Sequence, residues 1–354
     1  MGKHGKKEKN HQRRHKFSGY DDGAQEYPEY PPPKEDSQEE EEDDDDEEEQ
    51  QHPNSDDALP SKFLLYQQSV QSPKGDISYL QKFFLMYVGG RMPLHLQEDF
   101  CGTAFLSTEW IRGDPRKTAV GLDFDIDALN WCLENNANNT DTDSHSRIFL
   151  FHGNVLQPHE AKLVKSKTED LIKDVTLRDR DDEVLPPRDI VCAFNYSCCC
   201  LHKRKELISY FKHCHNALST KGGIFVMDLY GGTSSEQALK LKRKFPNFTY
   251  TWEQEEFDII ERKTRISLHY QLHKSKRKIR HAFSYSWRLW SLPEIKDCLE
   301  ESGFKSVHFW IKEMPNVSEM RSTRGFGAAR DDRYEEVSSF QQQDAWNAYI
   351  VAVA

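Results

Sequence analysis

Short apolar runs alternate with longer segments of helical periodicity between residues 94 and 229, and this alternation restricts the fold more than any other feature of the sequence. Such runs, separated by helices, are typical of βαβ units, whose parallel sheet carries helices on both faces. The expected strands are 94–97, 119–122, 148–151, 190–194 and 224–229. The expected helices are 103–111, 126–136 and 203–218, with two amphipathic helices before them at 63–70 and 77–88.

Residues 230–290 interrupt this alternation with extended, aromatic-rich stretches. After an expected helix at 236–244 come strands at 249–260, 264–272 and 279–289, and the last two flank Lys274-Ser275-Lys276-Arg277 as an antiparallel hairpin. The alternation then resumes with a helix at 292–302 and strands at 307–311 and 348–353. This order predicts an α/β fold, in which a seven-stranded Rossmann-like sheet carries an antiparallel β-rich insertion after its fifth strand.

Charge divides the chain into a leader and a body. Residues 1–60 contain 20 acidic and 8 basic side chains (net −12), whereas 61–354 contain 39 and 40 (net +1). The leader includes eleven consecutive acids at 39–49 and has little apolar surface, so we expect it to be disordered. We expect 61–354 to fold as one domain that carries 230–290 as an insertion. The basic cluster at 3–16 fits a nuclear address, a nucleic-acid arm or a solubilising tail.

No membrane span, secretory signal, transit peptide or myristoylation signal is recognisable in the sequence. It has no run of 18 apolar residues, and the basic stretch at 1–16 lacks the apolar core of a secretory signal. Lys6 stands where a myristoylation signal needs Ser or Thr, and the acidic run is foreign to transit peptides. We therefore expect a cytoplasmic or nuclear protein that does not engage membranes.

The eight cysteines indicate reduced thiols and not a metal centre. Three of them are adjacent, Cys198-Cys199-Cys200, and three neighbouring side chains cannot converge on one tetrahedral ion. The sequence contains no CxxC pair. We expect neither a metal site nor a disulfide framework.

Acidic residues follow the first two expected strands. The first strand leads into Glu98-Asp99-Phe100-Cys101-Gly102-Thr103, and the second ends at Asp123. Ligands of open α/β sheets bind at these carboxyl ends, where an acid after the second strand can accept both ribose hydroxyls. A dinucleotide needs G-x-G-x-x-G, but Gly102 stands alone here. An acid before the turn would repel a pyrophosphate, whereas it suits the ammonium and sulfonium of S-adenosylmethionine (SAM).

On these residues the chain resembles the class I SAM-dependent methyltransferases, over roughly 94–229 and 291–354. The stretch 98–103 is similar to a subgroup in which E-D-F-C-G-T replaces the usual glycine-rich turn, and 285–290 is also similar to that subgroup. The other matching segments are Gly121-Leu122-Asp123, Gly153-Asn154-Val155, Asp189-Ile190-Val191, Lys221-Gly222-Gly223 and Glu301-Ser302-Gly303-Phe304. The resemblance implies a methyltransferase sheet, an enzyme and SAM as its cofactor.

The resemblance also implies a cofactor site, made of Glu98, Cys101, Gly102, Thr103, Asp123, Asn154 and Asn195. Glu98 would help to organise the amino group of the methionine moiety, although it also suits the N-terminus of the next helix. The backbone of 101–103 would pass the cofactor, although any strand–helix turn favours glycine. Asp123 would hold the ribose, or else cap a loop.

Two asparagines would complete the site that the resemblance implies. Asn154 would replace the usual Asp beside the adenine amino group, since an amide oxygen can still accept that hydrogen bond. Asn195 would lie near the transferred methyl. Either asparagine also fits an ordinary turn.

Two departures from the family pattern concern the turn. Phe100 and Ala104 occupy positions that are usually glycine, and a Cβ is strained where φ is positive. Either the turn has another shape here, or cofactor binding is weakened. The stretch 194–197 also lacks the two prolines of the Asn-Pro-Pro-Tyr signature, so it does not support a nucleobase or Gln-amide acceptor.

The acceptor side is less defined in the sequence. An acceptor pocket or plain packing would each explain the aromatics Trp252, Tyr285, Trp287 and Trp290. The basic residues at 274–280 suit a phosphate grip or a solvated turn. A base is needed only for a protonated acceptor, and the candidates, left unranked, are His202, Tyr196 and Asp228.

Two functions compete on these observations. The first is a SAM-dependent methyltransferase with an unidentified acceptor, a small molecule being favoured over RNA or protein, and with 230–290 as an acceptor lid. The second is an inactive methyltransferase-like scaffold that binds RNA or protein, although such a scaffold has no need for both Glu98 and Asp123. A nicotinamide-dependent oxidoreductase is disfavoured by the missing glycines and by the two final strands.

Overall fold

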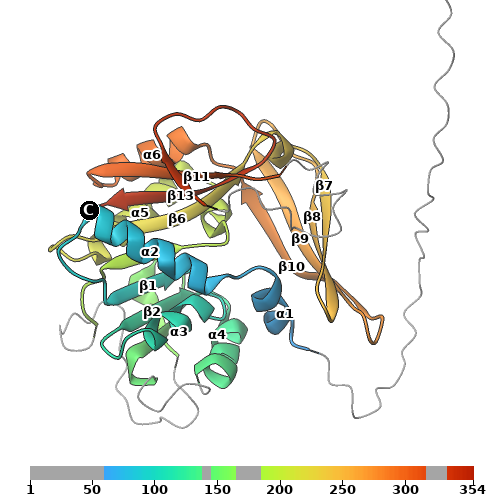
Figure 1. Ribbon diagram of the computed structural model, residues 1–354, viewed down its shortest axis with the longest axis horizontal. Coiled ribbons are helices and arrows are strands. Elements are labelled where there is room, and N and C mark those ends of the chain that lie inside the picture. Colours follow the sequence, from blue (N-terminus) through green and yellow to red (C-terminus); the bar gives the residue numbers. More distant parts are fainter. Residues whose placement is uncertain (1–59, 138–144, 165–184, 316–332) are drawn as a thin grey trace, which may run out of the picture. The chain divides into compact units, whose positions relative to one another are not determined.

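The computed structural model describes residues 60–137, 145–164, 185–315 and 333–354. Contacts divide the chain into two units, Met1–Asp57 and Ala58–Ala354, and the described residues all lie in the second unit. This unit contains a large mixed sheet with helices on both faces and a smaller antiparallel sheet beside it (Figure 1). In the described ranges, no helix has the length and apolar character that a membrane span requires.

The large sheet is of mixed direction. Its strands are β1 (His95–Asp99), β2 (Thr118–Asp123), β3 (Ile148–His152), β4 (Lys162–Leu163), β5 (Ile190–Ala193), β6 (Ile224–Gly231), β11 (Ser306–Glu313), β12 (Glu335–Val337) and β13 (Trp346–Val353). Their order is β12-β11-β13-β6-β5-β1-β2-β3-β4. Strands β3, β2, β1, β5 and β6 are parallel, and β13 runs antiparallel between β6 and β11.

The predicted number of seven strands is wrong, because the described part of this sheet has nine. The two additional strands, β4 and β12, pair antiparallel with β3 and β11 at the edges. They are two and three residues long, and strands this short leave no periodic signal in a sequence.

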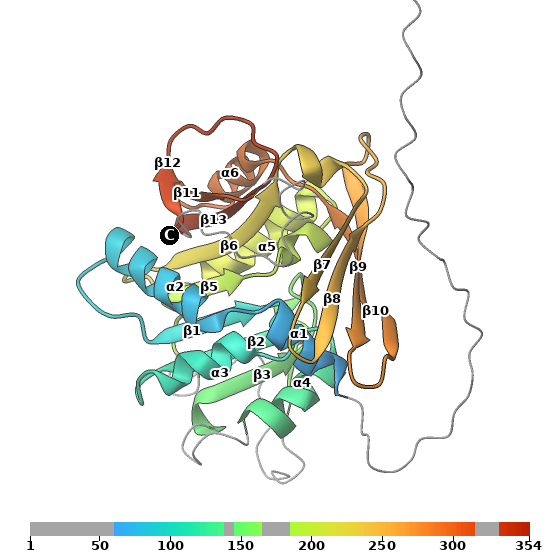
Figure 2. The same ribbon diagram turned by 45° about the vertical axis from the view of Figure 1, so that its right-hand side comes forward.

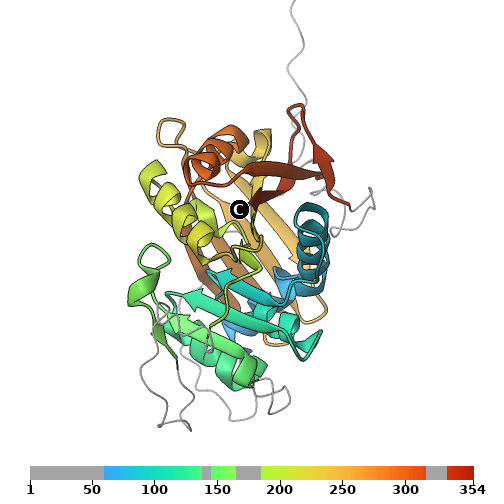
Figure 3. The ribbon, with the colours of Figure 1, turned by 90° about the vertical axis from the view of Figure 1, so that its left-hand side faces the viewer.

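Helices cover both faces of the large sheet (Figure 3). The α-helices of the described residues are α1 (Lys62–Ser69), α2 (Pro73–Tyr87), α3 (Phe105–Arg112), α4 (Ile126–Cys132), α5 (Arg204–Ala217) and α6 (Leu292–Glu301). Helices α2, α3 and α4 share one buried core, and α5 and α6 share the other. In β5, Ile190 and Cys192 belong to the first core while Val191 and Ala193 belong to the second, as the two-residue period of a strand requires.

The inserted segment forms a separate four-stranded antiparallel sheet, which stands beside the large sheet (Figure 2). Its strands, in the order β10-β9-β8-β7, are β7 (Leu239–Lys244), β8 (Phe248–Gln254), β9 (Lys263–Leu272) and β10 (Lys278–Arg288). The helix predicted at 236–244 is wrong, because 239–244 is strand β7. In β7, the half-buried Leu239 and Leu241 alternate with exposed lysines, and this period of two is that of a strand.

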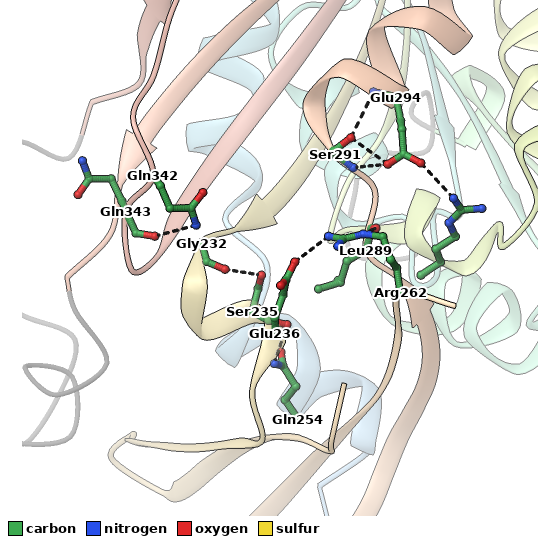
Figure 4. Close-up of polar contacts among 11 residues, drawn as sticks. Gly232, Ser235, Glu236, Gln254, Arg262, Leu289, Ser291, Glu294, Gln342 and Gln343 are labelled. Carbon is green, nitrogen blue, oxygen red and sulfur yellow. Dashed lines mark hydrogen bonds and ion pairs between the residues drawn. The ribbon is translucent and has the colours of Figure 1, made fainter. Parts of the chain in front are cut away.

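Polar contacts fix the insertion where it leaves and rejoins the large sheet (Figure 4). Gln254 at the end of β8 donates to the carbonyl of Ser235 (2.9 Å). The Arg262 guanidinium donates to the Glu236 carboxylate (2.8 Å) and to the Leu289 carbonyl (3.2 Å). Because Glu236 precedes the insertion sheet and Leu289 follows it, Arg262 ties its two ends together.

Candidate functional site

The turn between β1 and α3 contains three left-handed residues: Phe100 (φ 56°), Gly102 (φ 52°) and Ala104 (φ 45°). Outside glycine this conformation costs about 1–2 kcal/mol per residue. Packing offsets that cost, because the Phe100 ring lies edge-on to Tyr210 at 5.6 Å and Ala104 is fully buried. The turn therefore has left-handed backbone at 100 and 104 although neither residue is glycine.

Gly102 and Asp123 meet at the carboxyl edge of β1 and β2. The N–H of Gly102 donates to Asp123 Oδ2 (2.6 Å), and the N–H of Asp125 donates to Asp123 Oδ1 (2.8 Å). Burial raises the pKa of Asp123. A Cβ on Gly102 would meet no atom within 4 Å. The carboxylate thus clamps the turn while the backbone of Gly102 remains open to an approaching ligand.

Glu98 lies buried at the end of β1. Its Oε2 accepts hydrogen bonds from the Ser107 N–H (2.9 Å) and the Ser107 hydroxyl (2.6 Å), both in the first turn of α3. Burial raises the pKa of Glu98 to about 8, and the nearby Asp123 adds to the rise. Glu98 therefore binds the N-terminal turn of α3, which is one of the two roles expected for it. Both of these bonds use the same carboxylate oxygen.

Cys101 and Thr103 are buried within the turn. The Thr103 hydroxyl accepts from Gln67 Nε2 (2.7 Å), and its carbonyl accepts from Asn136 Nδ2 (2.8 Å). Gln67, on α1, was not predicted from the sequence as a residue of this site. Its signal is a glutamine on the buried face of an amphipathic helix, where a polar side chain needs a partner.

Both predicted asparagines lie in turns. Asn154 is exposed after β3, and its Oδ1 accepts from the Leu156 N–H (2.9 Å). After β5, Asn195 and Tyr196 are both left-handed (φ 58°). Their N–H groups donate to the Asp228 carboxylate at 2.9 and 2.7 Å. Asn154 therefore lies on the loop beyond β3, whereas Asn195 is held at the end of β5 by Asp228 on β6.

A cavity of about 150 Å³ opens beside Asn195 and Asp228, between the large sheet and the insertion. Three of the four predicted aromatics line it: Trp252, Tyr285 and Trp287. The Tyr285 and Trp287 rings stack at 5.5 Å, and Trp252 lies 5.6 Å from Trp287. These rings pack on one another and at the same time form a wall of the cavity.

Two other predicted residues are not among the described residues that line this cavity. Trp290 is buried, and its Nε1 donates to the Leu201 carbonyl (3.1 Å), so packing explains it. His202 lies with Nε2 2.7 Å from the Ser286 carbonyl. Of the three candidate bases, Asp228 and Tyr196 remain at the cavity.

Asp76 is a second carboxylate at this cavity and was missed from the sequence. It lies in the first turn of α2, where an acid is ordinarily a helix-terminal charge. The Tyr349 hydroxyl of β13 donates to it (2.5 Å). Burial raises the pKa of Asp76 to about 6 and that of Asp228 to about 8, and Asp76 adds to the second rise. No local pattern connects α2, β6 and β13, so only the tertiary structure brings these groups together.

Helix α1 connects the turn between β1 and α3 to the insertion. Besides the Gln67 contact with Thr103, the Ser69 hydroxyl lies 3.2 Å from the Tyr270 hydroxyl of β9. The Tyr66 ring lies 4.9 Å from the ring of Phe283 on β10. One short helix thus touches both sides of the site.

The fold is an α/β fold with a mixed sheet, and the site brings Glu98, Gly102 and Asp123 to the carboxyl edge of β1 and β2. No known family model matches the sequence, and no curated protein matches it. The chain is similar to a solved SAM-dependent methyltransferase from Clostridium acetobutylicum, with 13% sequence identity over 82% of this chain and 96% of that one and a TM-score of 0.48. It is also similar to a sugar N-methyltransferase from Streptoalloteichus, with 13% identity over 86% of this chain and 96% of that one and a TM-score of 0.48. A third similar structure is a SAM-bound amino pentose methyltransferase from Micromonospora echinaspora, with 11% identity over 84% of this chain and 99% of that one and a TM-score of 0.49.

Proposed function

We propose that this chain is a SAM-dependent methyltransferase of the subgroup with the E-D-F-C-G-T turn. The observation that carries the proposal is the clamp between Asp123 and the Gly102 amide, beside an open approach to the Gly102 backbone. An acid after the second strand and an open turn after the first suit a nucleoside. The buried acid Glu98 suits a ligand that is cationic at its other end.

Each site residue has a role in this proposal. Asp123 accepts the ribose hydroxyls with the lone pairs that its two backbone donors leave. Cys101, Gly102 and Thr103 present their backbone to the cofactor, and Glu98 faces the methionine ammonium. When bound, SAM supplies a methyl group on a positively charged sulfur.

Two asparagines and the insertion complete the proposed arrangement. Asn154 serves the adenine amino group, and Asn195 lies near the methyl. Residues 61–354 act as the methyltransferase domain, and 230–290 form its acceptor side. Positioning an acceptor close to the methyl supplies much of the rate through proximity and orientation.

Glu98 provides a proton-linked test of this assignment. With a pKa of about 8, most of its carboxyl is protonated at pH 7. A neighbouring ammonium favours the ionised form, so SAM binding is expected to release up to about one proton at pH 7. Calorimetric titration in two buffers of different ionisation enthalpy measures this number. Glu98→Gln keeps an acceptor for Ser107 and is expected to abolish the release. Equal release by both proteins would remove Glu98 from the cofactor site.

A second candidate function is an RNA- or protein-binding scaffold without activity. The lysines and arginines at 274–280 are exposed on the turn between β9 and β10 and at the start of β10, which favours this candidate. The exposed lysines on β7 do not favour this candidate. β7 is a strand at the edge of the insertion sheet, and lysines on an edge strand discourage edge-to-edge pairing with another chain. The methyltransferase assignment stands first, because a scaffold without activity has no need for both Glu98 and Asp123.

Titration of the full chain with SAM and with S-adenosylhomocysteine tests the assignment. We expect both to bind at one site per chain. If a folded sample binds neither, the left-handed Phe100 and Ala104 have closed the cofactor site, and the scaffold becomes the better description.

A further inference from the structure

We propose that the cavity between α2, β6 and the insertion holds the methyl acceptor, and that the acceptor is an amine with an apolar body. This inference rests on the proposed methyltransferase function and names its substrate class. The cavity borders Asn195, the residue assigned to the methyl end of the cofactor, so an acceptor inside it lies beside the reacting group.

The lining of the cavity is that of a cation site. Nine of its fifteen described lining residues are aromatic. Tyr196 from the large sheet meets Trp287 from the insertion edge-on at 5.8 Å, and Tyr285 stacks on the same Trp287 ring. Aromatic faces attract ammonium groups, most strongly where water is excluded. The rings are held by each other, so the cage is formed before an amine enters.

Two carboxyl groups in the cavity wall can balance the positive charge of a bound amine. Asp76 from α2 and Asp228 from β6 both line it, and the described lining contains no Lys, Arg or His. Buried carboxylates without a cationic neighbour favour their protonated forms, and an amine that brings a positive charge reverses this preference. An anionic acceptor would meet no cationic side chain in the described lining, and either carboxyl group in its ionised form would repel it.

An adjoining cavity of about 260 Å³ suits the rest of such a molecule. It shares Val70, Tyr196, Tyr250 and Trp252 with the first cavity. Its remaining wall includes apolar residues of β7, together with Met314 and the Arg243 side chain, whose guanidinium lies over Phe245 at 4.7 Å. A nitrogen in the aromatic cage would therefore be joined to an apolar body in the second cavity.

The transfer needs a neutral nitrogen. The ammonium first gives one proton to the Asp228 carboxylate, whose two oxygens also hold the turn at Asn195. The nitrogen lone pair then forms a bond to the methyl carbon while the carbon–sulfur bond breaks. That electron pair returns to sulfur, which becomes the neutral thioether of S-adenosylhomocysteine, and the methylated amine leaves with its positive charge.

Three probes of one shape test the inference: 2-phenylethylamine, 2-phenylethanol and 3-phenylpropanoate. Their binding to the full chain is measured by calorimetry, alone and with saturating S-adenosylhomocysteine, and methylation is followed as S-adenosylhomocysteine formed from SAM. We expect the amine to bind at least tenfold more tightly than the alcohol or the acid, and to be the probe that is methylated. Binding of the alcohol or the acid as tight as that of the amine would overturn the inference.

Two variants locate the binding site, with a matched control. Asp76→Asn keeps an acceptor for Tyr349 and is expected to weaken amine binding at least tenfold, with SAM affinity changed less than twofold. Trp252→Leu removes one cage ring and is expected to weaken amine binding about fivefold. Asp297→Asn, at an exposed acid of α6, controls for the lost charge. Unchanged amine affinity in both cavity variants would place the amine elsewhere. If the unaltered chain does not bind SAM at all, the result instead refutes the methyltransferase assignment.

Discussion

Asp123→Ala is expected to weaken SAM binding by about 1.5–3 kcal/mol, the range for a hydrogen bond to a charged group. The variant removes both oxygens that are assigned to the ribose, and it also releases the Gly102 amide, so the effect should lie toward the upper end. Calorimetric titration of the full chain measures the loss. Asp123→Asn retains one acceptor oxygen, so its affinity for SAM should lie between that of Asp123→Ala and that of the unaltered protein.

A neighbouring acid provides the control. Asp125 caps α4 by accepting from the N–H groups of Asp127 and Ala128. Asp125→Ala should lower the free energy of unfolding by about 1 kcal/mol, the usual effect of a lost N-cap, and leave SAM affinity unchanged. Equal SAM affinities for Asp123→Ala and the unaltered protein would refute the ribose assignment.

Asp189→Ala is expected to lower the free energy of unfolding by about 1–3 kcal/mol, because two backbone N–H groups lose their acceptor while Arg91, about a third exposed, can still be hydrated. Asp189 is buried, accepts from the Leu94 and His95 N–H groups (2.6 and 3.1 Å) and pairs with Arg91 (2.6 Å). It therefore fixes the start of β1 against β5. Urea denaturation measures the loss, and SAM affinity of the folded variant should not change.

The pair of Arg204 and Glu301 gives a contrast, because both side chains are about half exposed. Glu301→Ala should cost less than about 1 kcal/mol, the usual range for a surface ion pair. If Asp189→Ala and Glu301→Ala lower the free energy of unfolding by similar amounts, the burial of Asp189 contributes little to stability.

Among the parallel strands, β2, β3, β5 and β6 could be predicted because each contains an apolar run between helical segments. β7 could not be recognised by hydrophobicity alone, since its lysines outnumber its leucines. The turn after β1 and the acids of the proposed cofactor site follow strands directly, so local sequence indicates them. Asp76 and Gln67 each look like an ordinary residue of a surface helix, and their neighbours come from distant parts of the chain.

The contacts of α1 with Thr103 and with Tyr270 have a thermodynamic consequence. If SAM binding orders the turn and thereby α1, the insertion sheet that α1 touches is ordered as well. Any factor by which the cofactor improves acceptor binding must then equal the factor by which the acceptor improves cofactor binding, because linkage between two ligands is reciprocal. The two proposed ligands would then bind cooperatively without a dedicated hinge, through one eight-residue helix that touches both proposed sites.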